Sequence, residues 1–207
     1  EHINNQPLND SRLSLIKDDG ISALKLSPYS YDIIISQPSN PWSAGVGNLF
    51  TANFFQDCKS KLKSGGVLAQ WFNLYEMNDK ILKLVLRTLR SEFDNLQIWQ
   101  IGGNDILILC SNEQLKLDIE KSKKSFLEHE EYFERLNIKN FPTFLSLQIN
   151  NSTDHISIYA FDDDNLINTE DFPILEFDSP FAYFMNNQVT SFLQFDNRDD
   201  FAKHNLF

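Results

Sequence analysis

The sequence has few of the residues that build covalent or metal-held frameworks, and it has no long apolar run. Its 207 residues include only two cysteines, Cys58 and Cys110. Both fall within apolar periodic segments, which argues against a disulfide framework and a cysteine-based metal motif. No apolar stretch reaches the roughly 18 to 20 residues that a membrane helix requires. We therefore expect a domain that works in a reducing, cytoplasmic compartment.

A starting methionine is also missing, and the first residues, EHINNQ, have neither the basic start nor the apolar stretch of a signal peptide. We interpret the chain as a piece of a longer polypeptide. Its length suits one domain, or one domain with an appendage, and allows a sizeable core.

Basic residues are scarce in the C-terminal quarter. The net charge is −11, and residues 151–207 hold 11 acids against 2 bases. Because a nucleic-acid footprint would be a basic stripe, we expect no nucleic-acid partner. An acidic surface could attract a cationic small molecule such as a polyamine. Solvated acidic loops around residues 162–164 are the simpler explanation of the same charge.

Metal ligands do not gather in the sequence either. Glu170, Asp171 and Glu176 lie close together, but carboxylates at such spacing without a histidine are weak evidence for a metal. The four histidines are scattered over positions 2, 129, 155 and 204. We therefore expect no metal site.

The apolar pattern predicts an α/β fold. Runs of strand length occupy residues 13–17, 31–36, 67–72 and 105–111, and their near-continuous apolar character is typical of strands buried on both faces. Helical periodicity covers residues 50–62 and 81–93. This alternation predicts a parallel sheet in which residues 31–36 are the most buried strand. We expect an α/β domain over 1–112 and a helical, loop-rich extension over 113–207.

Ligands of an open parallel sheet bind beyond the carboxyl ends of its strands. Three predicted strand ends carry polar residues: Asp18-Asp19-Gly20, the stretch QPSNPW at 37–42, and the stretch QWFN at 70–73. We expect the functional site among them.

Four stretches of the sequence are similar to segments of a known family. They are DSRLSLIKDDGISAL at 10–24, YDIIISQPSNPWSAGVGNLFTANFF at 31–55, LKSGGVLAQWFNLYEM at 62–77 and NTEDFPILEFDSP at 168–180. They resemble the spermidine synthase (polyamine aminopropyltransferase) family, and more closely its bacterial spermidine-synthase-like branch, which is often fused to a membrane region. The resemblance implies a Rossmann-like, class I S-adenosylmethionine-type fold. It also implies an S-adenosyl donor, either S-adenosylmethionine or its decarboxylated form, and a membrane-spanning region elsewhere in the polypeptide.

On the donor side, Asp19 matches the family's acidic residue whose carboxylate accepts a hydrogen bond from the adenine amino group. Gly20 follows it in the same turn, so the resemblance implies that both residues bind the donor. Aspartate is equally suited to cap a helix at this position, and the two roles are compatible.

On the acceptor side, the sequence departs from the family. Gln37 stands at the position of the family's catalytic aspartate, which helps to bind the attacking amine and to accept its proton. Asn40 replaces a second, substrate-binding aspartate. These two lost charges predict that the protein is not an efficient putrescine aminopropyltransferase. The alternative is that residues 37–42 form only a structural turn, for which the prolines at positions 38 and 41 are suited.

Gln70 and Tyr75 lie at and past the third strand end. They could line the same cleft as substrate-binding residues, or they could pack at the sheet edge with their polar tips in water. Trp42 is more typical of a packed lid residue than of a substrate contact.

The sequence lacks two further elements of the family. The glycine-rich loop after the first strand is absent, and so is the acidic residue after the second strand that holds the ribose. Residues 1–9 are too few to supply two strands and a helix. We therefore expect an N-terminally incomplete fold without the first strand, the glycine-rich loop and the second strand.

Two functions from different classes stay open. The first is a transferase domain that uses an S-adenosyl donor for aminopropyl or related transfer to a small-molecule acceptor such as a polyamine. The second is a non-catalytic nucleoside-binding or interaction module that kept the fold and lost its acids, because fold resemblance alone does not separate the two.

Overall fold

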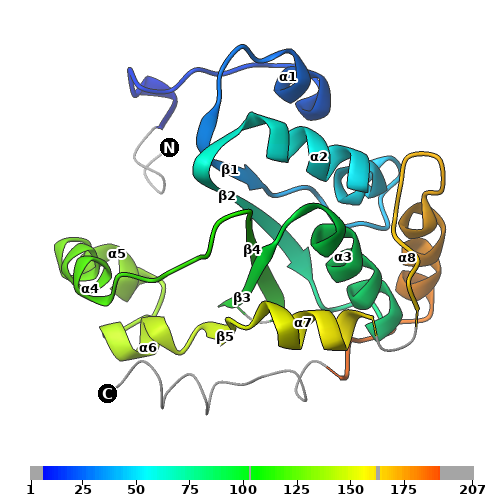
Figure 1. Cartoon of the computed structure of the whole chain (residues 1–207). Helices are drawn as coiled ribbons and strands as arrows, with labels where there is room; N and C mark the ends of the chain where they lie inside the picture. Colours follow the sequence, from blue (N-terminus) through cyan, green and yellow to red (C-terminus); the bar gives the residue numbers. More distant parts are fainter. Residues whose placement is uncertain (1–6, 103, 162–163, 192–207) are drawn as a thin grey trace.

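A computed structural model describes residues 7–102, 104–161 and 164–191. Its centre is a five-stranded mixed sheet with strand order β1-β2-β4-β3-β5. Helices α2, α3 and α7 lie across one face of this sheet, α4 to α6 gather at one side of the molecule, and α8 lies at the opposite side (Figure 1). The predicted α/β class is confirmed.

The strands and helices have the following bounds. The strands are β1 (Tyr31–Ser36), β2 (Leu62–Asn73), β3 (Asn95–Gly102), β4 (Asp105–Ser111) and β5 (Gln148–Asn150). The α-helices are α1 (Gly20–Leu26), α2 (Ala52–Lys61), α3 (Asp79–Glu92), α4 (Ile119–Glu128), α5 (Glu130–Arg135), α6 (Phe141–Leu145), α7 (Thr153–Ala160) and α8 (Ile174–Phe184). Two 3₁₀-helices, η1 (Pro7–Asn9) and η2 (Val46–Phe50), complete the described elements.

Two helices follow the predicted periodicity closely. In α2, Phe54, Phe55 and Cys58 are buried. In α3, the side chain of Asn78 caps the helix by accepting a hydrogen bond from the Ile81 amide at 3.0 Å. The buried residues of both helices join one apolar core with those of β2, β3 and β4. Capping and amphipathic spacing therefore decide these two elements locally.

The prediction that residues 31–36 form the most buried strand is wrong. β1 is the edge of the sheet and pairs only with β2, in parallel. Ile33 and Ile35 are 61% and 70% exposed. The isoleucine run thus gives a strand, but apolar character alone does not determine which strand has a neighbour on both sides.

The first predicted strand, residues 13–17, is not formed, and no strand precedes β1 in the part of the chain that the structure describes. Leu13, Leu15 and Ile16 are exposed in irregular backbone. A strand requires a partner for its backbone N–H and C=O groups, and this segment pairs with no described strand. Asp19 therefore does not lie at a strand end, contrary to prediction.

Residues 105–111 do form a strand, but the parallel arrangement expected for them is wrong. β4 runs antiparallel to both β2 and β3, and β3 itself was not predicted. Alternate residues Ile106, Ile108 and Cys110 are fully buried, while Leu107 and Leu109 are half-buried. This alternation is typical of antiparallel strands covered mainly on one face.

The C-terminal half contains two differently placed parts. Helices α4 and α6 contribute to a small apolar cluster of their own around Phe126, Phe141 and Leu145. Residues 148–161 and 164–191 return to the main body, where β5 pairs with β3 and α7 packs on α3. The division of the chain into 1–112 and 113–207 stays a prediction.

Among the described residues, no helix has both the length and the apolar content needed to cross a membrane.

Candidate strand-end site

The loop after β1 and the end of β2 form the predicted acceptor region. The register pairs Ser36 with Gln70, so the residues that follow β1 and β2 emerge at the same end of the sheet, beyond the carboxyl ends of these strands. The backbone beyond Ser36 runs through Trp42 to η2, and Gly45 adopts a positive φ of 80°. That conformation is accessible to glycine at little steric cost.

Three aromatic rings meet at this end of the sheet. Trp42 stacks on Tyr183 of α8 with ring centroids 5.0 Å apart, and it meets Tyr75 edge-on at 5.9 Å. The Tyr75 hydroxyl donates a hydrogen bond to Asn40 Oδ1 at 3.4 Å. Asn40 and Tyr75, which are 35 residues apart in sequence, are thus in contact, while their role as substrate-binding residues of one cleft stays a prediction.

Two amide side chains lie near the end of β2, on opposite faces of the sheet because they are three residues apart in one strand. Gln70 and Asn73 are both fully buried. Gln70 Nε2 donates to the Trp71 carbonyl and Asn73 Nδ2 donates to the Tyr75 carbonyl, at 3.1 and 2.7 Å. The oxygens Gln70 Oε1 and Asn73 Oδ1 are buried without a hydrogen-bond partner. Since such acceptors are costly to leave unpaired, they are suited to a donor group of a ligand or to water.

Gln37 lies at the surface one residue beyond β1. Its position immediately after Ser36 places it at the same sheet edge as Gln70. An exposed neutral amide adds neither charge nor basicity to this edge.

A carboxylate that sequence reasoning missed reaches the same edge from β4. Asp105 pairs with Asn73 in the antiparallel register, and one of its oxygens is buried without a hydrogen-bond partner. Burial raises the pKa of Asp105, although a hydrogen bond with Trp71 opposes the rise. Burial also raises the pKa of the Tyr75 phenol, and the charges of Asp105 and Glu76 add to that effect. Tyr75 is therefore close to the carboxylates of Asp105 and Glu76, neither of which stands at the positions of the family's two aspartates, 37 and 40.

Asp19 and Gly20, the predicted donor-binding residues, lie at the start of α1 and are exposed. The Asp19 carboxylate accepts a hydrogen bond from the Ser22 amide at 2.8 Å, which confirms the helix-cap role. This backbone bond lowers the pKa of Asp19. Its second oxygen leaves room for the adenine role, which stays a prediction.

Helix α8 and the residues before it hold the loop in place. Glu176 Oε1 accepts from the Gly45 amide at 2.8 Å, and Ser179 Oγ donates to the Pro41 carbonyl at 2.9 Å. Buried Asn168 donates from Nδ2 to the Phe50 carbonyl at 3.0 Å and accepts from the Leu175 amide at 3.0 Å. Except for the Asn168–Leu175 bond, these bonds join residues more than 100 apart in sequence, so the loop conformation depends on the C-terminal segment.

Glu176, Ser179 and Tyr183 were not predicted as parts of the site. Glu176 and Ser179 lie in the NTEDFPILEFDSP stretch at 168–180, in which the sequence suggests Glu176 only as a metal ligand, and Tyr183 lies beyond that stretch. In the described residues, no group of three or more His, Cys, Asp or Glu side chains is arranged to hold a metal ion.

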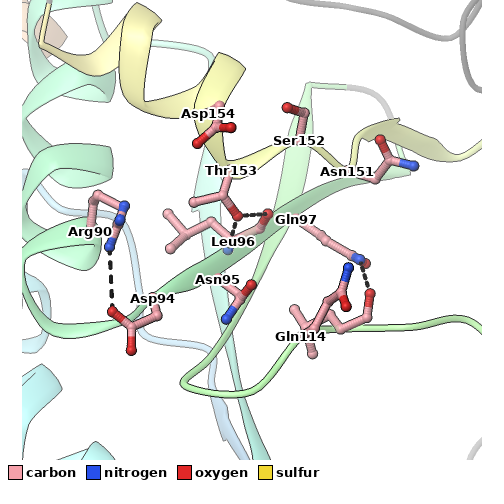
Figure 2. A pocket seen from close by; sticks show the side chains of 11 residues that line it. Arg90, Asp94, Asn95, Leu96, Gln97, Gln114, Asn151, Ser152, Thr153 and Asp154 are labelled. Atoms are coloured by element: carbon pink, nitrogen blue, oxygen red, sulfur yellow. Dashed lines mark hydrogen bonds and ion pairs between the residues drawn. The ribbon is translucent and has the colours of Figure 1, made fainter.

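A separate hollow of about 280 Å³ lies between the start of β3, the end of α3 and the first turn of α7 (Figure 2). Many of its polar groups already have protein partners. Thr153 Oγ1 accepts from the Leu96 amide at 3.0 Å, and Gln97 Nε2 donates to the Leu115 carbonyl at 2.8 Å. None of the predicted site residues lines it.

Comparisons with a family model and with curated proteins both find similarity to polyamine-synthesising enzymes. Residues 1–101 match the spermine/spermidine synthase domain. A polyamine aminopropyltransferase of Buchnera aphidicola is 28% identical over 162 residues, which cover 72% of this chain and 56% of the relative. One of Prochlorococcus marinus is 39% identical over 87 residues, 42% of this chain and 30% of the relative.

Two solved structures are also similar to this chain. A probable spermidine synthase from Corynebacterium glutamicum aligns with a TM-score of 0.44 and 17% identity, over 56% of this chain and 45% of its own. Human methyltransferase-like protein 13 in complex with SAH aligns with a TM-score of 0.43 and 24% identity, over 61% and 60%.

The chain spans about half the length of the first curated relative. The matched domain includes β1, β2 and the strand-end loop, which are the segments that carry the site described above. Over residues 1–101, this chain is similar to the spermidine synthase family.

Proposed function

We propose that this chain is the acceptor-side part of a spermidine-synthase-like transferase domain, in which an amine or related nucleophile attacks an S-adenosyl donor. The observation that carries the proposal is the meeting of Asn40, Trp42 and Tyr75 at the end of β2. Aromatic faces attract cations, and amide oxygens accept hydrogen bonds from ammonium groups. The site therefore has the chemistry to receive a small cationic acceptor.

The reaction requires no covalent bond between the protein and its substrates. A sulfonium is a good leaving group, so positioning of the nucleophile and removal of its proton are the main contributions that side chains can make. Gln37 is unable to take the proton. Asp105, whose pKa is raised by burial, is our candidate for that role, because a base with a raised pKa accepts a proton more readily near neutral pH.

The neutral side chains at Gln37 and Asn40 make putrescine a poor acceptor in this proposal. A diamine carries two ammonium groups, and the family's aspartates at these positions would pair with them. The acceptor that suits this site is consequently a nucleophile with fewer positive charges, held by the aromatic rings and by the amide oxygen of Asn40.

The test is a calorimetric titration of putrescine into the unaltered chain and into the double variant Gln37→Asp/Asn40→Asp. Restoring two carboxylates should tighten putrescine binding by at least about tenfold, or about 1.4 kcal/mol. The matched control is Gln114→Asp/Asn151→Asp, which adds the same charges at the separate hollow. The proposal fails if the control variant gains as much affinity as the site variant, or if neither gains any.

The second candidate is a non-catalytic nucleoside-binding module, favoured by the neutral residues at the family's two acidic positions. Titration with methylthioadenosine separates the two functions. Nucleoside binding that Asp19→Ala removes, together with no response of putrescine binding to Gln37→Asp/Asn40→Asp, would support the module instead of the transferase.

A further inference from the structure

Glu76 has a backbone conformation that its residue type rarely adopts. Its φ is 55°, in the left-handed region, which glycine and asparagine enter far more easily than glutamate. The residues on both sides of it are held in place, because Tyr75 forms a β-bridge with Gln188 and the side chain of Met77 is fully buried. The turn between β2 and α3 therefore contains a glutamate at a position where glycine would be less strained.

The Glu76 carboxylate has neither an ion-pair partner nor a hydrogen-bond partner within the part of the chain that the structure describes. Its side chain is half-buried. Neighbouring carboxylates are engaged, since Asp79 accepts a hydrogen bond from the Ser191 amide and Glu176 accepts one from the Gly45 amide. Because a partly desolvated charge without a partner is unfavourable, the Glu76 carboxylate is suited to pair with a cation of a ligand.

Glu76 lies beside the aromatic and amide groups of the strand-end site. The hydroxyl of the preceding residue, Tyr75, donates to Asn40 Oδ1 at 3.4 Å, and its ring meets that of Trp42 edge-on at 5.9 Å. Burial raises the pKa of the Tyr75 phenol, and the charges of Asp105 and Glu76 add to that rise. The negative charge of Glu76 thus acts where the aromatic rings would hold a cation.

We propose that Glu76 pairs with the ammonium group of the acceptor, and that this single ion pair selects an amine with one positive charge. The inference rests on the proposed function of the strand-end site. An ammonium group at the Tyr75 ring would have the Glu76 carboxylate as its counter-ion and Asn40 Oδ1 as a hydrogen-bond acceptor. A second ammonium group would find only the neutral amides of Gln37 and Asn40, which do not offset the loss of its hydration.

The test is a titration of n-butylamine, which carries one charge, into the full chain, followed by the indole signal of Trp42. Glu76→Gln removes the charge and keeps the shape, so it should weaken binding at least about fivefold. Raising the ionic strength from about 0.05 to about 0.5 M should weaken binding to the unaltered chain more than to this variant. The matched control is Glu92→Gln, at a half-buried glutamate at the other end of α3, and it should leave the affinity unchanged.

A second variant, Glu76→Gly, separates the carboxylate from the turn. Glycine adopts a positive φ at little steric cost, so this variant should be at least as stable as the unaltered chain in urea denaturation. It should lose butylamine affinity as Glu76→Gln does. Unchanged affinity in either variant overturns the inference, as does a Trp42 signal that butylamine does not shift. A similar loss of stability in both variants would assign the side chain to packing alone and would also overturn it.

Failure of this inference differs from failure of the proposed function. Glu76 is unaltered in Gln37→Asp/Asn40→Asp, whose putrescine affinity tests the proposed function. A gain of affinity in that double variant, together with unchanged butylamine binding by Glu76→Gln, rejects the role of Glu76 alone. No gain in the double variant and no effect of Glu76→Gln reject both.

Discussion

Removal of the Asn168 side chain is expected to destabilise the whole protein and to loosen the strand-end loop. Asn168 is fully buried between the loop and α8. In Asn168→Ala, the Leu175 amide loses its acceptor and the Phe50 carbonyl loses its side-chain donor. Each buried polar group left unsatisfied costs about 1 to 3 kcal/mol. We therefore expect a loss of about 2 to 5 kcal/mol in the free energy of unfolding.

That loss would be a large share of the 5 to 15 kcal/mol typical of a folded domain. Urea denaturation followed by tryptophan fluorescence and by far-ultraviolet circular dichroism measures it. Asn165→Ala, at an exposed position in the same segment, is the control and should change stability by less than about 0.5 kcal/mol.

The two optical probes also report whether the C-terminal segment unfolds with the rest of the protein. Buried Arg87 of α3 donates hydrogen bonds to the carbonyls of Leu166 and Ala160, so the described residues on both sides of 162–163 are coupled to α3. Coincident transitions are expected in the variant and in the unaltered chain. A loss below about 1 kcal/mol in Asn168→Ala, or a separate early transition of the C-terminal segment in the unaltered chain, would refute this reasoning.

Three further outcomes are expected. Burial would raise the pKa of Asp79, but hydrogen bonds from Ser191 and Thr190 outweigh it and hold that pKa below its ordinary value. This contact should stabilise the folded protein by about 1 kcal/mol above about pH 4, and that stability should be lost as the pH falls further. Asp79→Asn should remove this pH dependence in acid denaturation curves. S-adenosylmethionine should bind this chain weakly or not at all, because this sequence lacks the acidic residue that forms a charge-assisted hydrogen bond with the ribose, worth about 1.5 to 3 kcal/mol. Calorimetry that gives low-micromolar affinity would contradict this. With decarboxylated S-adenosylmethionine and putrescine, spermidine formation by the longer polypeptide should be at least about 10²-fold slower than for the Buchnera aphidicola relative, because Gln37 is not a base at the position of the family's catalytic aspartate and Asn40 no longer pairs with the distal ammonium of putrescine. Equal rates in a product assay would disprove this, and would leave Asp105 as a sufficient base.

The parts of the fold that could be predicted are those whose signals are local. Helices α2 and α3 follow from apolar residues every three to four positions and from a capping Asn78. The exposure of Ile33 and Ile35 in β1 could not be predicted, because it depends on which strands lie beside β1. Likewise, the sequence of β4 is apolar at both alternate sets of positions, which conceals that one face is only partly covered and that the strand is antiparallel.

The site divides in the same way. Asn40 and Tyr75 follow predicted strands, so their approach could be inferred from the geometry of sheets. Tyr183, which stacks on Trp42, and Glu176, which holds Gly45, lie more than 130 residues from their partners. Contacts at such separation leave no periodic signal in one sequence. Asp105 was missed because it begins an antiparallel strand that was expected to run the other way.

The central claim, that the end of β2 with Asn40, Trp42 and Tyr75 is an acceptor site, is tested most directly by the tryptophan indole signals in a ¹H–¹⁵N correlation spectrum. The chain has three tryptophans, at positions 42, 71 and 99, and single Trp→Phe variants assign their signals. On addition of putrescine to the Gln37→Asp/Asn40→Asp variant, the Trp42 signal should shift with saturation while the Trp99 signal stays in place. Saturable binding that leaves Trp42 unchanged, or that shifts Trp99 as much as Trp42, would contradict the claim.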